Sequence, residues 1–147
     1  MLAFVACSDE NDSVDAAPVE INSKALSIVS GTIVEIESEV EEGIAAWEVE
    51  IVTAGGAEVQ VYCSQDNQEL LRVDGEGPPF DYEVTPGNGL FNLSQALTAT
   101  ENDANGALEK WRLRPDDSFN NDWVYTFEFA GNKVTISATT GDVLKVE

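Results

Sequence analysis

The sequence contains no histidine, only seven basic residues and only two cysteines among its 147 residues. Without histidine it lacks the commonest general base and the commonest neutral metal ligand, and no Ser–His or Cys–His pair can form. The spacings of a calcium-binding EF-hand and of a phosphate-binding glycine loop are also missing. We therefore predict a protein that is not an enzyme, with no catalytic residues, no metal ligands and no cofactor.

The two cysteines, Cys7 and Cys63, stand in very different sequence contexts, so a disulfide between them is not expected. Cys63 ends a segment of alternating character in which Val59 and Val61 share its side of a strand. A free cysteine in such a position usually behaves as a small hydrophobic residue. We predict that Cys63 packs in the core.

Basic residues are scarce: the chain has 28 acidic residues and only 7 basic ones, which gives a net charge of −21. This balance excludes nucleic acid and anionic membrane surfaces as partners, because both are bound through Lys and Arg. It permits a cationic partner, divalent cations or a salty habitat. The imbalance is uneven, since residues 1–90 carry 19 acidic and 2 basic residues whereas residues 91–147 carry 9 and 5.

The sequence also lacks a hydrophobic run long enough for a transmembrane helix. Residues 1–7 form a short apolar run that ends in a small residue and Cys7, and this ending resembles a bacterial lipobox, in which the cysteine receives a lipid. We predict that residues 1–7 are the remnant of a lipoprotein signal, with lipidation at Cys7. Residues 8–19 are polar and acidic, and are predicted to form a disordered tether. The lipid on Cys7 is then the expected membrane contact.

The second half of the chain repeats the layout of the first half with a period of about 75 residues. Ser23–Leu26 corresponds to Ser94–Leu97, and Trp47 corresponds to Trp123. A repeat of this length indicates one small unit used twice rather than a solenoid of short units.

Each copy begins with a helical pattern and continues as segments of alternating apolar and polar residues. In the first copy, Asn22 or Ser23 is predicted to cap the helix and Leu26 to lie in its apolar stripe. The short turns between the alternating segments predict an antiparallel meander. The predicted fold is α+β, with two repeats that each pack a short helix on an antiparallel β-meander of three to four strands. The predicted parts are a first unit at 20–74, a linker at 75–90 and a second unit at 91–147.

The first strand of the first unit predicts an acidic surface. Val34, Ile36, Ser38 and Val40 are predicted to face the core, and every second residue between and after them is a glutamate. The matching strand of the second unit is basic instead. The resulting candidate binding face comprises Glu35, Glu37, Glu39, Glu41, Glu48, Glu50, Lys110, Arg112 and Arg114.

Like charges opposite one another destabilise a sheet, so something must offset the row of glutamates. Four explanations remain open from the sequence. The face is simply solvated in a salty medium, the outer faces of the two units approach and neutralise each other, the face docks a basic protein, or it binds Ca²⁺ weakly.

Four segments carry a resemblance to a known family: Gly106–Trp111, Trp123–Glu128 and Ile136–Leu144 in the second unit, and Gly31–Glu37 in the first. They resemble segments of the PepSY family. The resemblance covers about residues 20–147 as two copies. It implies an α+β unit of the kind found in the propeptides of secreted metallopeptidases and in cell-envelope proteins. It also implies a role in binding or inhibiting peptidases, without catalytic residues.

The expected function is that of a non-catalytic binding protein of the cell envelope, which binds or inhibits a peptidase or binds another envelope protein. The alternative is a structural or cation-binding acidic surface lipoprotein without a specific protein target. The expected location is the periplasm or the outer membrane through a lipid at Cys7, or the medium if Cys7 carries no lipid.

Overall fold

The structure is a computed structural model of the whole chain, and it describes residues 18–147. The lipidation site predicted at Cys7 and the tether predicted from residue 8 onward, as far as residue 17, lie outside the described residues.

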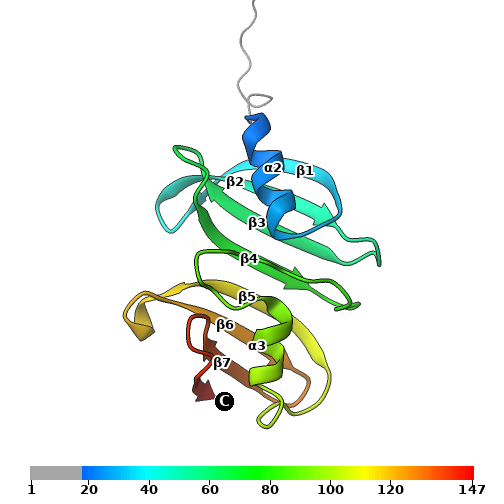
Figure 1. Cartoon of the computed structure of the whole chain (residues 1–147), viewed down its shortest axis with the longest axis vertical. Coiled ribbons are helices and arrows are strands. Elements are labelled where there is room, and N and C mark those ends of the chain that lie inside the picture. The colour runs from blue at the N-terminus through cyan, green and yellow to red at the C-terminus, as the bar shows by residue number, and fades with distance from the viewer. Residues whose placement is uncertain (1–17) are drawn as a thin grey trace, which may run out of the picture.

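All the strands belong to one antiparallel sheet in the order of the sequence, and both helices lie on the same face of it (Figure 1). The predicted α+β class is confirmed. Whether the two units share one sheet could not be decided from the sequence, and here they do. The helices are α2 (Val19–Ile28) and α3 (Leu93–Ala99), with a short 3-10 helix η2 (Asp117–Phe119). The strands are β1 (Thr32–Glu41), β2 (Ile44–Val52), β3 (Glu58–Ser64), β4 (Leu70–Glu76), β5 (Leu108–Asp116), β6 (Asp122–Phe129), β7 (Lys133–Ser137) and β8 (Val143–Val146).

The core lies between the sheet and the two helices, and it extends from β1 to β7. Paired residues form an apolar row that crosses every strand: Ile36, Val49, Val61, Val73, Leu113, Tyr125, Ile136 and Val143. The six members between β2 and β7 are fully buried. Each buried side chain of this size contributes roughly 1.5–3 kcal/mol. The period-two pattern of the sequence is thus matched in the strands from β2 to β7.

Helix α2 begins earlier than predicted. Pro18 occupies the N-cap position and has the fixed φ that suits a helix entrance, so the helix starts at Val19. Asn22 and Ser23 therefore lie inside the helix, and the prediction that one of them caps it is wrong. The buried stripe of the helix runs through Ile21, Ala25 and Ile28, so Leu26 points away from it and is 38% exposed instead of lying in the core.

Helix α3 begins at Leu93, after Asn92. The Asn92 backbone N–H donates to Gln95 Oε1 at 2.8 Å. Glu83 also supports this end, because its Oε1 accepts from the Ser94 N–H at 2.9 Å and from the Val84 N–H at 3.0 Å. Burial favours the neutral carboxyl, but hydrogen bonds from Ser94 and Val84 outweigh it and lower the pKa of Glu83.

Strand β1 departs from the predicted alternation because it carries a bulge and lies at the edge of the sheet. The register shifts between Ile33 and Glu35, so one extra residue is inserted there. Val34 is 54% exposed and Val40 is 70% exposed, although both were predicted to face the core. A strand at the edge has a neighbour on one side only, and the core does not reach its far end.

The two units are joined by β4 and β5, which pair directly. Strand β4 runs to Glu76, into the segment predicted as linker. At the junction Trp111 lies where a side chain on Gly75 would stand, and the Trp111 Nε1–H donates to the Tyr82 hydroxyl at 2.8 Å. Phe80 and Tyr82 both pack against the core, so these two aromatics hold the segment after β4 against it.

Candidate functional site

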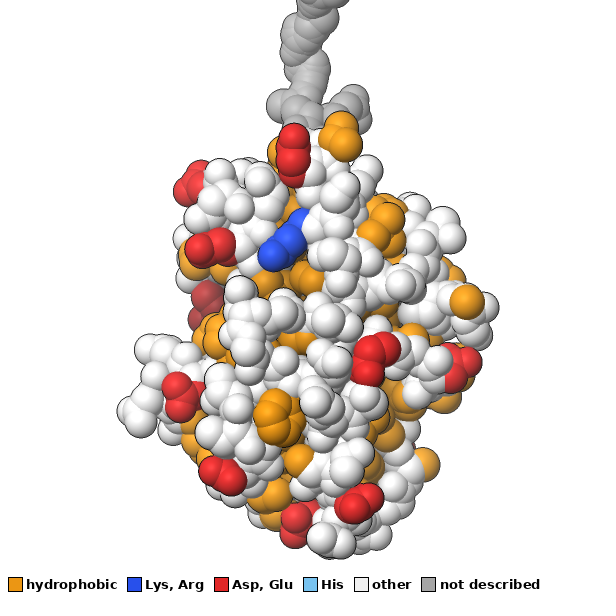
Figure 2. Space-filling view, viewed as in Figure 1, with side chains coloured by type: hydrophobic (Ala, Val, Ile, Leu, Met, Phe, Trp, Pro, Cys, Tyr) orange, Lys and Arg blue, Asp and Glu red, His pale blue; other side chains and the backbone are white. Residues whose placement is uncertain are grey.

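The face of the sheet turned away from α2 and α3, here called the outer face, carries the candidate binding residues. One row of paired residues crosses all eight strands on this face: Glu35, Glu50, Gln60, Asp74, Arg112, Thr126, Thr135 and Lys145. The row begins acidic in the first unit and ends with a cation in the second. On the helix face, by contrast, charged side chains are scattered rather than gathered (Figure 2).

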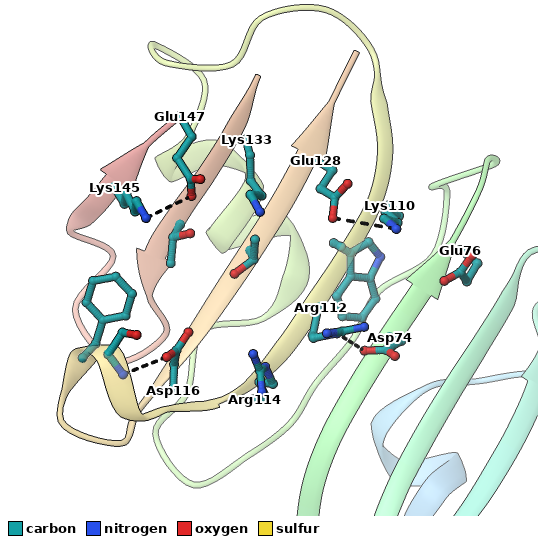
Figure 3. A pocket seen from close by; sticks show the side chains of 15 residues that line it. Asp74, Glu76, Lys110, Arg112, Arg114, Asp116, Glu128, Lys133, Lys145 and Glu147 are labelled. Atoms are coloured by element: carbon teal, nitrogen blue, oxygen red, sulfur yellow. Dashed lines mark hydrogen bonds and ion pairs between the residues drawn. The ribbon is translucent and has the colours of Figure 1, made fainter. Parts of the chain in front are cut away.

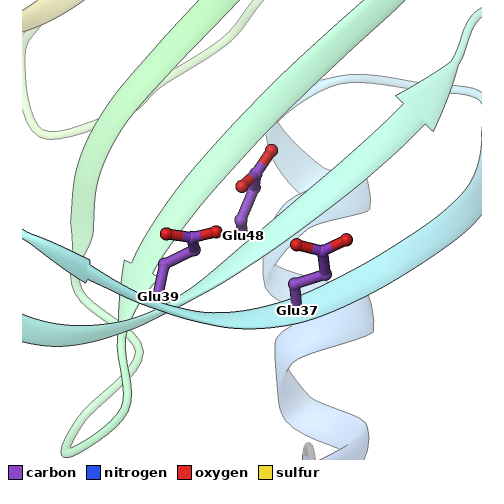
Figure 4. Close-up of side chains that lie close together, drawn as sticks. All are labelled: Glu37, Glu39 and Glu48. Carbon is purple, nitrogen blue, oxygen red and sulfur yellow. The ribbon is translucent and has the colours of Figure 1, made fainter.

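The acidic half of the outer face centres on Glu37, Glu39 and Glu48, which project from β1 and β2 (Figure 4). Carboxylate oxygens of these three lie within 4.8 Å of one another. Glu37 is paired with Glu48, and Glu35 with Glu50, so like charges stand directly opposite each other. Three carboxylates this close offer oxygen ligands of the kind that a hard cation takes.

Crowding and burial perturb the titration of these groups. A hydrogen bond with Glu35 and repulsion from its charge raise the pKa of Glu37. Burial first, then the charges of Glu39, Glu37 and Glu50, raise the pKa of Glu48. Burial and the neighbouring Glu58 raise the pKa of Glu50. The folded chain therefore holds protons on this face more tightly than separate glutamates would.

Glu41 was predicted to belong to the acidic face, but it is 8% exposed and engaged internally. Arg72 Nη1 contacts Glu41 Oε1 at 3.1 Å, and Arg72 Nε lies 3.0 Å from Asp74 Oδ2. The guanidinium also lies over the Tyr62 ring, 4.7 Å from its centroid. Burial, followed by the charge of Glu48, raises the pKa of Tyr62 to about 12. Nothing in the sequence indicated that Arg72 would draw Glu41 out of the acidic row.

The basic residues of β5 pair near the junction rather than with the acidic cluster. Arg112 Nε lies 3.0 Å from Asp74 Oδ1, and Arg114 Nη1 lies 3.3 Å from Glu42 Oε2. The explanation in which the two outer faces approach each other is wrong, because they are neighbouring parts of one sheet and do not face each other. Of the six predicted glutamates, all within the described residues, Glu41 alone forms an ion pair.

A charged hollow of about 340 Å³ lies on the outer face of the second unit (Figure 3). It gathers five of the chain's seven basic residues together with five acidic ones. The basic residues are Lys110, Arg112, Arg114, Lys133 and Lys145. Lys133 and Lys145 were not among the predicted site residues. Their alternation with the buried apolar residues of β7 and the apolar residues of β8 was the sequence signal that placed them on this face.

Cys63 is fully buried, in agreement with the prediction that it packs in the core. Burial raises the pKa of its thiol to about 11, so the side chain stays protonated and unreactive at neutral pH. Trp123 is partly buried, whereas Tyr125 and Phe127 are fully buried. The aromatic stripe of β6 therefore forms core rather than a surface for a ligand.

Two repeated α+β units, a helix-covered face and a polar outer face define the class of the protein: a tandem module of small sheet domains. The chain belongs to the PepSY family, described as peptidase propeptide and YPEB domain, which matches residues 17–74 and 92–147. The boundaries of the two matches fall close to those of the two units.

None of the curated proteins compared with the chain matches it. A solved structure of a candidate lipoprotein from Clostridium difficile 630 is 19% identical, covers 88% of each chain and has a TM-score of 0.39. Neither helix of the described residues is long and apolar enough to cross a lipid bilayer.

The ion-pair cluster around Arg72 predicts a large effect of one substitution. Arg72→Met leaves Glu41 and Asp74 as poorly exposed carboxylates without this cation. We expect a loss of about 3–5 kcal/mol in the free energy of unfolding, measured by urea denaturation. Arg114→Met is the matched control, because its partner Glu42 is largely exposed and the expected loss is below about 1 kcal/mol. Equal losses in the two variants would show that burial of the partners does not matter.

The crowded glutamates predict an unusual pH dependence. Because the folded pKa of Glu48 is raised, its contribution to stability is best at low pH and falls as the pH rises through the window above the ordinary value of 4.5. Glu48→Gln should therefore stabilise the protein at pH 7 by up to about 1 kcal/mol, and the gain should vanish near pH 4. Thermal unfolding at both pH values and low salt measures this. Glu101→Gln serves as the exposed control, and the same gain there would contradict the explanation.

Proposed function

We propose that this chain is a non-catalytic binding protein of the cell envelope that docks another protein on the outer face of its sheet. The observation that carries this proposal is the eight-stranded sheet with helices on one face and a row of charges across the other. The face of the sheet that the helices cover is used to form the core. The outer face carries charged side chains in addition to those whose ion pairs stabilise the fold.

The partner class follows from the family and from the charge. PepSY units carry the description of peptidase propeptides, which supports a peptidase as the first candidate partner. Binding on a sheet without a reactive nucleophile is non-catalytic, and a bound peptidase would be held or inhibited rather than modified. A net charge of −21 steers a basic partner toward the chain and repels acidic ones.

The outer face offers two different contact areas to such a partner. Glu35, Glu37 and Glu39 make the β1 edge of the first unit acidic, whereas the hollow of the second unit mixes both signs. A second hollow of about 410 Å³ lies where the units meet, and it combines the apolar Ile44 and Leu71 with charged neighbours. An interface with an apolar centre and a charged rim is the usual arrangement for protein docking.

The competing function is that of an acidic surface protein that binds cations without a protein target. Its support is the group formed by Glu37, Glu39 and Glu48, whose oxygens approach within 4.8 Å. These carboxylates are exposed or only half-buried, so any ion would bind weakly. Thermal unfolding with and without Ca²⁺ separates the two functions. A Ca²⁺-dependent rise in melting temperature, together with no stoichiometric partner, would favour the cation-binding function.

A capture experiment tests the docking function with variants of equal charge. The outer-face variant carries Glu35→Lys, Glu37→Lys and Glu39→Lys. The control variant carries Glu20→Lys, Glu101→Lys and Asp103→Lys, which change the same charge at exposed positions in or beside the helices. We expect the wild type and the control to bind a purified envelope peptidase or another envelope protein, and the outer-face variant to bind at least about tenfold more weakly. Protease activity with and without the chain measures the inhibitory form of the function. Equal losses in both variants would contradict docking on the outer face.

The envelope location is a separate proposal that rests on the apolar run ending at Cys7. We expect cells that express the full chain to attach a labelled fatty acid to it, and Cys7→Ser to abolish the label. Cys63→Ser is the control, because that thiol is buried in the core. A label that survives Cys7→Ser would show that the lipobox resemblance is accidental.

A further inference from the structure

The far side of strand β1 is an open edge of the sheet. The strand spans ten residues from Thr32 to Glu41 and pairs with β2 on one side. Among the described residues, no backbone group of β1 forms a hydrogen bond outside that pairing. Strand β8, at the opposite edge, spans only four residues. An open strand of this length presents a row of unpaired N–H and C=O groups, which form a template for another strand.

Apolar side chains of β1 are also left uncovered. Val40 is 70% exposed and Val34 is 54% exposed, which leaves apolar surface in water at both ends of the strand. On the outer face, Glu35, Glu37 and Glu39 project at every second residue. A strand that added to β1 would bring its own side chains beside the exposed valines and beside the row of glutamates, because neighbouring strands lie about 4.8 Å apart.

The charges of β1 decide which strand fits. A second copy of β1 would place glutamates against glutamates, and like charges across a strand pair are destabilising. A strand with Lys or Arg at every second position would instead place each cation beside one of the carboxylates of Glu35, Glu37 and Glu39. The crowding that raises the pKa of Glu37 would be relieved by such cations.

We infer that the β1 edge binds an extended basic segment of a partner protein by strand addition, with alternate Lys or Arg side chains on the glutamates. This inference rests on the proposed binding function and specifies how the acidic end of the outer face engages its partner. The backbone bonds supply affinity, and the alternating charges select the sequence and its register. The same glutamates keep the open edge from pairing with copies of itself.

A short synthetic peptide tests the inference against the full chain. The probe is acetyl-Lys-Val-Lys-Val-Lys-Val-Lys-amide, in which cations and apolar side chains alternate as the edge requires. We expect saturable binding in calorimetry and at least about tenfold slower amide hydrogen exchange within Thr32–Glu41. The peptide with Glu in place of every Lys should not bind. The outer-face variant should lose the probe, whereas the helix-side control variant should retain it.

Backbone methylation of the probe separates strand addition from simple charge attraction. In a paired strand, the N–H groups of alternate residues point toward the neighbour, so one set faces β1 and the other faces solvent. One peptide is methylated on the backbone nitrogen of every Lys, and the other on the backbone nitrogen of every Val. The charge of the side chains is unchanged in both. We expect one isomer to lose at least about tenfold in affinity and the other to bind like the parent.

Three outcomes would overturn the inference. Equal binding by the two methylated isomers would show that charge alone holds the peptide. No binding of the parent peptide would show that the edge does not accept a strand, although docking of a protein on the outer face, measured by capture, would stand. A dimer in sedimentation that the peptide dissociates would show that a second copy occupies the edge.

Discussion

The rest of the structure depends on the pairing of β4 with β5. This pairing turns two units, each too small to be secure alone, into one sheet with one continuous core. It requires a close approach, because Trp111 occupies the space beside Gly75 where any side chain would collide. It is reinforced on the outer face, where Asp74 lies between Arg72 and Arg112. The same few residues therefore fix both faces of the junction.

Joining the units edge to edge gives the two faces different tasks. Both helices fall on one side, and the strands from β1 to β7 place apolar residues in the core on that side. The outer faces become a single surface whose charge changes from the acidic Glu35 and Glu50 to the basic Arg112 and Lys145. Had the units stacked face to face, these charges would have neutralised each other. In one sheet they remain available to a partner, apart from the pairs at the junction.

Much of the fold could be predicted from the sequence because strands with one buried face must alternate. Cys63 was expected to be buried and Arg112 to be exposed, and the structure has them so. The prediction of burial was wrong at residues that do not lie in a strand with one buried and one exposed face. Val40 belongs to an alternating segment, but it lies at the edge where no neighbour covers it. Glu41 follows the pattern of an exposed residue, but Arg72, 31 residues away, draws it into an ion pair.

The sequence by itself determined the periodicity, the two copies of the unit, the absence of histidine chemistry and the excess of negative charge. These properties follow from residue types and their spacing along the chain, which local structure preserves. Only the tertiary structure decided that β4 and β5 pair, that β1 is an open edge and that five basic residues share one hollow. Those features join residues far apart in the chain, and their positions depend on which strand edges meet when the core is buried.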